Sequence, residues 1–72
     1  MPHVIRVEPL GDEWALHDGD DKNPQVFASG AKAEAAAMNL GARLADTGKA
    51  VEVRIILRDG AVAGRFVCRA AA

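Results

Sequence analysis

The carboxylates between residues 18 and 24 are the first side chains that could do chemistry, and that chemistry is cation binding. Asp18, Asp20 and Asp21 cluster beside a glycine, as the oxygen ligands of a calcium loop do. The spacing departs from that motif. Counted from Asp18, Lys22 takes the fifth position, and Ser29 takes the twelfth, where a bidentate glutamate belongs. We therefore predict a solvated acidic turn and no metal site.

The two histidines and the single cysteine are the residue types that most often bind zinc. Strand alternation places His3 on the face of Ile5, whereas His17 lies opposite the face of Trp14, so the two rings do not converge on one ion. A nucleophilic Cys68 would need a neighbouring base, and no spacing implies one. We predict surface or edge histidines, and an apolar packing role for Cys68.

The chain has few hydroxyl side chains that could act as nucleophiles. The chain has no tyrosine, and its only hydroxyl residues are Ser29 and Thr47. Both fall where the ends of a helix are expected. The sequence therefore predicts no catalytic residue, no cofactor and no enzyme.

Arginines offer a binding surface on the predicted open face of a sheet. Arg54 falls directly opposite Arg65, and like charges facing each other across two strands would be relieved by an anion. Glu8, Glu13 and Glu52 share that face, and no aromatic residue is expected there to stack bases. Nucleic-acid binding is thus the alternative hypothesis, through Arg6, Arg54, Arg58, Arg65 and Arg69.

Two apolar surfaces indicate self-association as a homodimer. A second stripe with spacings of three and four runs along the predicted helix, and apolar residues interrupt the open face of the sheet. A domain of this size gains much from pairing. The candidate residues are Ala35, Met38, Ala42 and Ala45 on the helix, and Ile56, Ala63 and Val67 on the sheet.

Hydrophobic periodicity predicts the elements that position these residues. Residues 3–8 and 13–17 alternate around a proline-glycine turn and read as an antiparallel hairpin, with Trp14 as its core anchor. Residues 26–27 return to the core as a short strand. The alanine-rich segment 31–46 predicts one amphipathic helix, which Ser29 or Gly30 caps and Gly48 ends.

The last third of the chain predicts a second hairpin. Residues 51–58 alternate strictly, and Asp59-Gly60 favours a two-residue type I′ turn. That turn places Val53 opposite Phe66 and Leu57 opposite Val62, so that both strands direct apolar side chains to one side.

Length and composition limit the class of protein. The 72 residues suffice for one domain, residues 1–72, and the formal net charge is −1. One cysteine excludes an internal disulfide, the apolar runs are far shorter than the ~20 residues that span a bilayer, and no export signal is visible. We expect a cytoplasmic protein that does not enter membranes.

The pattern resembles a known bacterial family, the domain of unknown function numbered 2188. The resemblance covers roughly residues 3–66 and depends on Trp14-Ala15-Leu16, on Lys32-Ala33-Glu34-Ala35 at the helix start, on Val51-Glu52-Val53 and on Arg58-Asp59-Gly60. Ala31 departs from it, standing where the family commonly has a serine or threonine cap. The resemblance implies a small β-β-α-β-β domain and transfers no catalytic residue.

Together these patterns predict an α+β fold: a β-β-α-β-β antiparallel sheet of four main strands with one amphipathic helix on one face. The predicted function is a non-catalytic binding or self-association module, and the alternative is a nucleic-acid-binding accessory domain.

Overall fold

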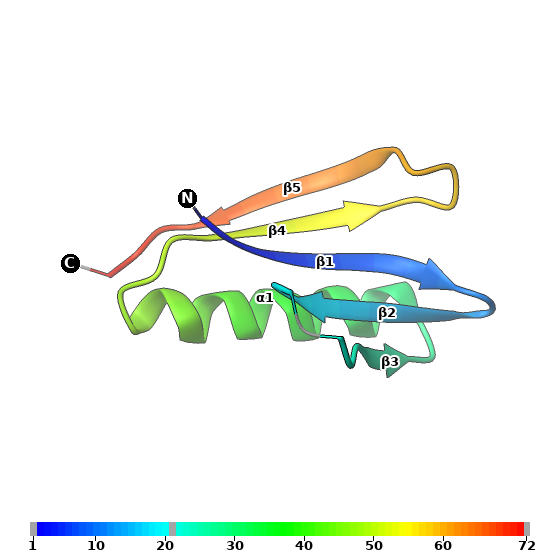
Figure 1. Ribbon diagram of the computed structural model, residues 1–72, viewed down its shortest axis with the longest axis horizontal. Helices are drawn as coiled ribbons and strands as arrows, with labels where there is room; N and C mark the ends of the chain where they lie inside the picture. Colours follow the sequence, from blue (N-terminus) through cyan, green and yellow to red (C-terminus); the bar gives the residue numbers. More distant parts are fainter. Residues whose placement is uncertain (1, 21, 72) are drawn as a thin grey trace.

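Five strands form one sheet in the computed structural model, and one helix lies along one face of it (Figure 1). The structure describes residues 2–20 and 22–71. The elements are β1 (His3–Leu10), β2 (Glu13–Asp18), β3 (Gln25–Phe27), α1 (Gly30–Asp46), β4 (Val51–Ile56) and β5 (Val62–Cys68), and the strand order is β3-β2-β1-β4-β5. The structure therefore confirms the α+β class and the single covering helix, and β3 is the short strand expected near Phe27.

The sheet is mixed, so the prediction of an antiparallel sheet is wrong at its centre. β1 and β4 run parallel, with His3 opposite Val51 and Val7 opposite Ile55. β2 is antiparallel to β1, and β3 is antiparallel to β2, so β3 runs in the same direction as β1. The helix then carries the chain back to the end of the sheet where β1 starts, and β4 runs parallel to β1 from there. The two hairpins therefore join side by side in the same direction (Figure 1).

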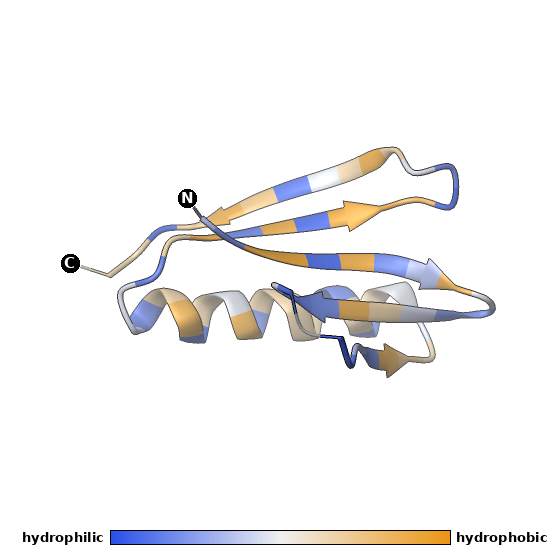
Figure 2. Cartoon of the chain, in the orientation of Figure 1, coloured by the Kyte–Doolittle hydropathy of each residue, from blue (hydrophilic) through white to orange (hydrophobic). Residues whose placement is uncertain are grey.

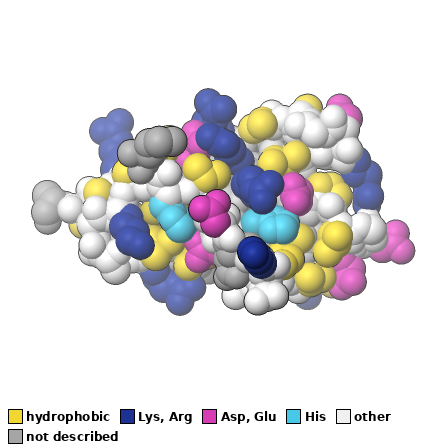
Figure 3. Space-filling model, in the orientation of Figure 1, with side chains coloured by type: hydrophobic (Ala, Val, Ile, Leu, Met, Phe, Trp, Pro, Cys, Tyr) yellow, Lys and Arg dark blue, Asp and Glu magenta, His cyan; other side chains and the backbone are white. Residues whose placement is uncertain are grey.

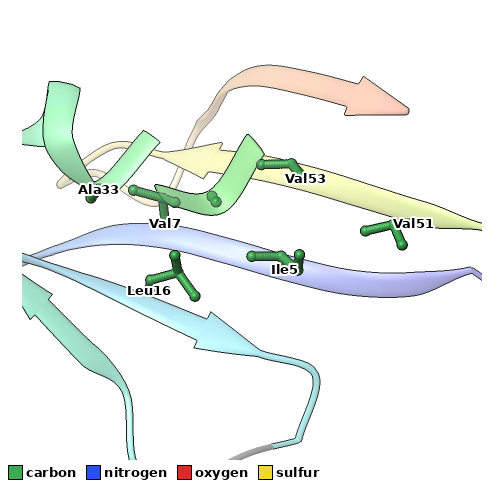
Figure 4. Close-up of a cluster of buried hydrophobic side chains, with 7 residues drawn as sticks. Ile5, Val7, Leu16, Ala33, Val51 and Val53 are labelled. Atoms are coloured by element: carbon green, nitrogen blue, oxygen red, sulfur yellow. The ribbon is translucent and has the colours of Figure 1, made fainter. Parts of the chain in front are cut away.

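The core lies between α1 and the face of the sheet that carries the alternating apolar residues. Ile5, Val7, Val51 and Val53 are fully buried, and Figure 4 shows them gathered with Leu16 and Ala33 between the strands and the helix. Hydropathy alternates along β1 and β4 in the same way (Figure 2). The period-2 pattern thus selected the buried face correctly.

Both ends of α1 follow the local signals in the sequence. Ser29 is the N-cap, and its side-chain oxygen accepts a hydrogen bond from the backbone N–H of Lys32 at 3.2 Å. Gly48 follows the helix with a φ of +96°, the left-handed conformation that glycine adopts at low cost. Thr47 donates its hydroxyl to the carbonyl of Leu44 at 2.6 Å.

Small residues at every fourth position bring α1 close to the sheet. The buried helical residues are Ala33, Ala37, Gly41 and Ala45. Met38, Leu40 and Leu44 are partly buried and pack against the core. Within the predicted self-association stripe, Ala45 and Met38 therefore already contact this chain's own core, and Ala35 and Ala42 are the exposed members.

The second hairpin turns differently from the prediction. A type I′ turn requires positive φ at both central residues, and no described non-glycine residue has one. Instead the N–H of Gly60 bonds the carbonyl of Leu57 at 2.9 Å, and Gly60 alone is left-handed, with φ +87°. The pairings of Val53 with Phe66 and of Arg54 with Arg65 are confirmed.

A register shift follows this turn. Ile56 faces Val62, so the predicted pairing of Leu57 with Val62 is wrong, and Ala63 is the extra residue of a bulge. The register is regular again from Gly64 to Cys68.

Candidate functional site

Four basic side chains form one row across the open face, which is the side of the sheet away from α1. Arg6 on β1 is the register partner of both His17 on β2 and Arg54 on β4. Arg54 is in turn opposite Arg65 on β5. Strands are spaced about 4.8 Å apart, so this basic row extends over about 14 Å. Only the parallel pairing of β1 with β4 brings Arg6 and His17 into it.

Two carboxylates hold the basic row in place. Glu52 accepts a hydrogen bond from Arg54 at 2.6 Å and forms an ion pair with Arg65 at 3.1 Å, and its side chain is only 13% exposed. Glu8 lies 2.9 Å from the ring of His17 and 3.8 Å from Arg6. Glu8 follows Arg6 and Glu52 precedes Arg54 on parallel strands, so one carboxylate flanks each side of the row.

The row keeps an excess of positive charge and of hydrogen-bond donors. Three guanidinium groups against two carboxylates leave one excess positive charge when His17 is neutral. Each guanidinium carries five N–H donors, and the ion pairs with Glu8 and Glu52 use only part of them. The side chains of Arg6, Arg54 and Arg65 are 41%, 37% and 59% exposed, so these donors are accessible from solvent.

A hollow of about 450 Å³ lies beside the row. Arg6, Arg54 and Val4 line one part of it, and Gly19 and Asp20 line another. Figure 3 shows basic, acidic and histidine side chains close together on one face of the molecule, with apolar groups between them. The hollow is open and lined by both charged and apolar residues, unlike the enclosed apolar clefts that usually hold small organic ligands.

The other two arginines of the predicted set lie outside the row. Arg58 sits in the loop of the second hairpin, and its guanidinium donates to the carbonyl of Gly11 at 2.6 Å. That bond joins the turns of the two hairpins, which meet because parallel strands end at the same edge of the sheet. Arg69 follows β5 and is exposed.

The outer edge of β5 is a second candidate surface, and it contains Ala63 and Val67 of the predicted self-association residues. The sheet order places β5 last, and within the described chain it pairs with β4 alone. Val62, Phe66 and Val67 are 49%, 39% and 66% exposed. Phe66 faces the helix side of the sheet, yet it stays accessible because α1 lies mainly over β1, β2 and β4.

The sheet residues proposed for self-association are all near this edge. Val67 is the most exposed large apolar residue on β5, Ala63 is exposed at the bulge, and Ile56 is half-buried on β4. Val62, which faces Ile56, enlarges this surface. The alternation pattern could not identify Val62 because the bulge changes the register there.

The remaining reactive side chains have structural partners. His3 bonds Asp18, Cys68 lies against Gly41, and Ser29 and Thr47 hold the ends of α1. Asp20 is exposed in the acidic loop, whereas Asp21 lies outside the described residues. Across the described part of the chain, no group of three or more His, Cys, Asp or Glu side chains has a geometry suited to a metal ion.

Comparison of the chain with protein families, with curated proteins and with solved structures finds no match. The resemblance to the domain of unknown function numbered 2188 therefore stays a prediction. Among the described residues, no helix has the length and apolar character needed to cross a membrane.

Replacing Glu52 tests whether it stabilises the row. We expect Glu52→Gln to lower the free energy of unfolding by about 1 kcal/mol, because Arg54 and Arg65 lose their shared counter-charge while the side-chain shape is kept. Urea denaturation at low and high salt measures it, and the loss should shrink at high salt, where charges are screened. Glu13→Gln, at an exposed position, is the control and should change stability by under about 0.5 kcal/mol. Equal effects of the two variants would contradict the assignment.

Proposed function

We propose that the protein is a non-catalytic self-association module in which two copies pair along β5. The observation that carries this proposal is the outer edge of β5, which has no partner strand among the described residues, is seven residues long and carries exposed apolar side chains on both faces of the sheet. An edge strand of this kind presents a row of unpaired N–H and C=O groups to any strand that approaches.

The two edges of the sheet differ in a way that supports this proposal. β3 has three residues and follows Pro24, so it offers few backbone groups. β5 contains no proline, and its stretch from Gly64 to Cys68 has regular register. Short edge strands, prolines and charged residues prevent unwanted pairing of sheet edges. β3 is short, whereas β5 is longer and has a single charged residue, Arg65.

A second copy of the chain is the occupant that fits β5. In an antiparallel pair about a twofold axis, each strand supplies the donors and acceptors that the other lacks, so the surface is self-complementary. Arg65 is the only charged residue within β5, and its bond to Glu52 offsets the repulsion between two copies. The short β3 edge ends further growth, so pairing stops at a dimer with one ten-stranded sheet.

A matched pair of lysine substitutions tests the proposal. Sedimentation from micromolar to millimolar concentration should show a dimer for the parent and for Val26→Lys, which changes an exposed valine on β3. Val67→Lys should weaken dimerisation by about tenfold or more, because it places an ammonium group in the paired interface. Both valines are exposed, so neither change should unfold the monomer.

Hydrogen exchange distinguishes strand pairing from packing of the sheet faces. Pairing predicts that backbone amides of β5 exchange more slowly as the concentration rises, while those of β3 do not change. A parent that remains a monomer at millimolar concentration, or a dimer without concentration-dependent protection in β5, would overturn the proposal.

A further inference from the structure

We infer that the basic row of His17, Arg6, Arg54 and Arg65 binds the sugar–phosphate backbone of a nucleic acid. The row lies within one copy of the chain, so this binding does not require the pairing of β5. Phosphate oxygens accept the charge-assisted hydrogen bonds that guanidinium groups donate, and several contacts of this kind supply affinity without reading sequence.

The shape of the charge distribution favours a linear polyanion. The cations stand in a line one residue wide across four strands, and Glu8 and Glu52 flank that line on opposite sides. A chain of phosphates running across the strands meets the cations and avoids both carboxylates. A broad anionic surface such as a membrane would also lie over Glu8 and Glu52, whose carboxylates would repel it.

The groups around the row determine which parts of the nucleic acid it can contact. Among the described residues, Trp14, Phe27 and Phe66 belong to the helix side of the sheet, so the open face offers no large aromatic side chain on which a base could stack. The His17 ring is the one ring in the row, and it is already paired with Glu8 at 2.9 Å. Asp20 lines the same hollow as Arg6, and its carboxylate disfavours phosphate in that part of the surface. We therefore expect backbone contacts along the row, and no preference among base sequences.

Salt dependence gives the expected size of the effect. Three arginine–phosphate contacts predict that log Kd rises with log salt concentration with a slope of about 2 for a single-stranded oligonucleotide. In Arg54→Gln/Arg65→Gln one of the three contacts remains, so the slope should fall to about 0.7 and affinity at low salt should fall about tenfold or more.

A control with the same change in net charge separates the row from general electrostatics. Arg43→Gln/Lys49→Gln also removes two positive charges, from exposed positions on α1 and on the loop after it. This variant should bind the oligonucleotide like the parent. Glu52→Gln should bind more tightly than the parent, because it removes a carboxylate from the side of the row. A merely structural role for the arginines does not predict that gain.

The experiment is fluorescence anisotropy at low salt with a labelled oligothymidylate, with a duplex of equal length, and with phosphatidylserine vesicles as competitor. Circular dichroism confirms that each variant is folded. Binding of either nucleic acid that the row variant loses and the control keeps supports the inference. Absence of binding by the parent, equal losses in both double variants, or stronger binding to the vesicles than to either nucleic acid would overturn it. Arg65 lies on β5, so sedimentation of both the parent and the row variant shows separately whether a loss of binding accompanies a change in the dimer.

Discussion

We expect Trp14→Ala to lower the free energy of unfolding by about 3–5 kcal/mol, because it removes a large half-buried ring and leaves a cavity. The ring connects three elements. Trp14 is opposite Phe27 on β3 and Pro9 on β1, and its ring lies so close to Gly30 that a Cβ there would stand 3.1 Å from it. The start of α1 and the β3 edge both lose their support in the variant.

That loss is a large fraction of the roughly 4–11 kcal/mol expected for a domain of 72 residues, since stability is typically about 0.05–0.15 kcal/mol per residue. Chemical denaturation followed by circular dichroism measures the effect, because Trp14 is the only tryptophan and its fluorescence disappears in the variant. Val26→Ala is the control on β3, at an exposed position, and should cost under about 0.5 kcal/mol. A loss below about 1 kcal/mol for Trp14→Ala would show that the ring contributes little to the core.

We expect Gly41→Leu to destabilise the protein by about 3 kcal/mol or more, because the helix is too close to the sheet at this position for a side chain of that size. A Cβ at Gly41 would stand 3.0 Å from the sulfur of Cys68, 3.4 Å from Val53 and 3.6 Å from Val51. Leucine adds further carbons to that space, and the helix must move away from β4 and β5 to admit them. Thermal unfolding measures the loss.

A smaller substitution at Gly41 tests the same contact, because the contact decides whether the substitution raises or lowers the stability. Gly41→Ala should destabilise the parent, in which the contact with the Cys68 sulfur opposes the helix propensity of alanine, worth about 0.8–1.0 kcal/mol. In a Cys68→Ala background the tightest contact is gone, and Gly41→Ala should stabilise the protein. A stabilising effect in both backgrounds would show that the sheet yields at this position, and would contradict the large effect of leucine.

Local signals in the sequence were enough for the separate elements and for much of the surface chemistry. The Gly48 end of the helix and the pairing of Arg54 with Arg65 were predicted and are confirmed, and of the two predicted caps, Ser29 and Gly30, the structure shows Ser29. Each depends on residues within a few positions or within one hairpin, where spacing in the chain determines spacing in the fold. The turn at Asp59-Gly60 was predicted in position and wrong in type, because one left-handed glycine allows a longer loop.

The sequence determined which residues form strands and helix and which side of the strands faces the core, because these follow from periods of 2 and 3.6 along the chain. The side of the helix was predicted less well, since Met38 and Ala45 of the expected second stripe lie toward the core. Only the tertiary structure decided that β1 and β4 pair in parallel, because the two hairpins are separated by a 17-residue helix and no local pattern sets their mutual direction. That one pairing brings Arg6 and His17 beside Arg54 and leaves β5 at the edge of the sheet. Both candidate surfaces therefore depend on contacts between segments that lie far apart in the chain.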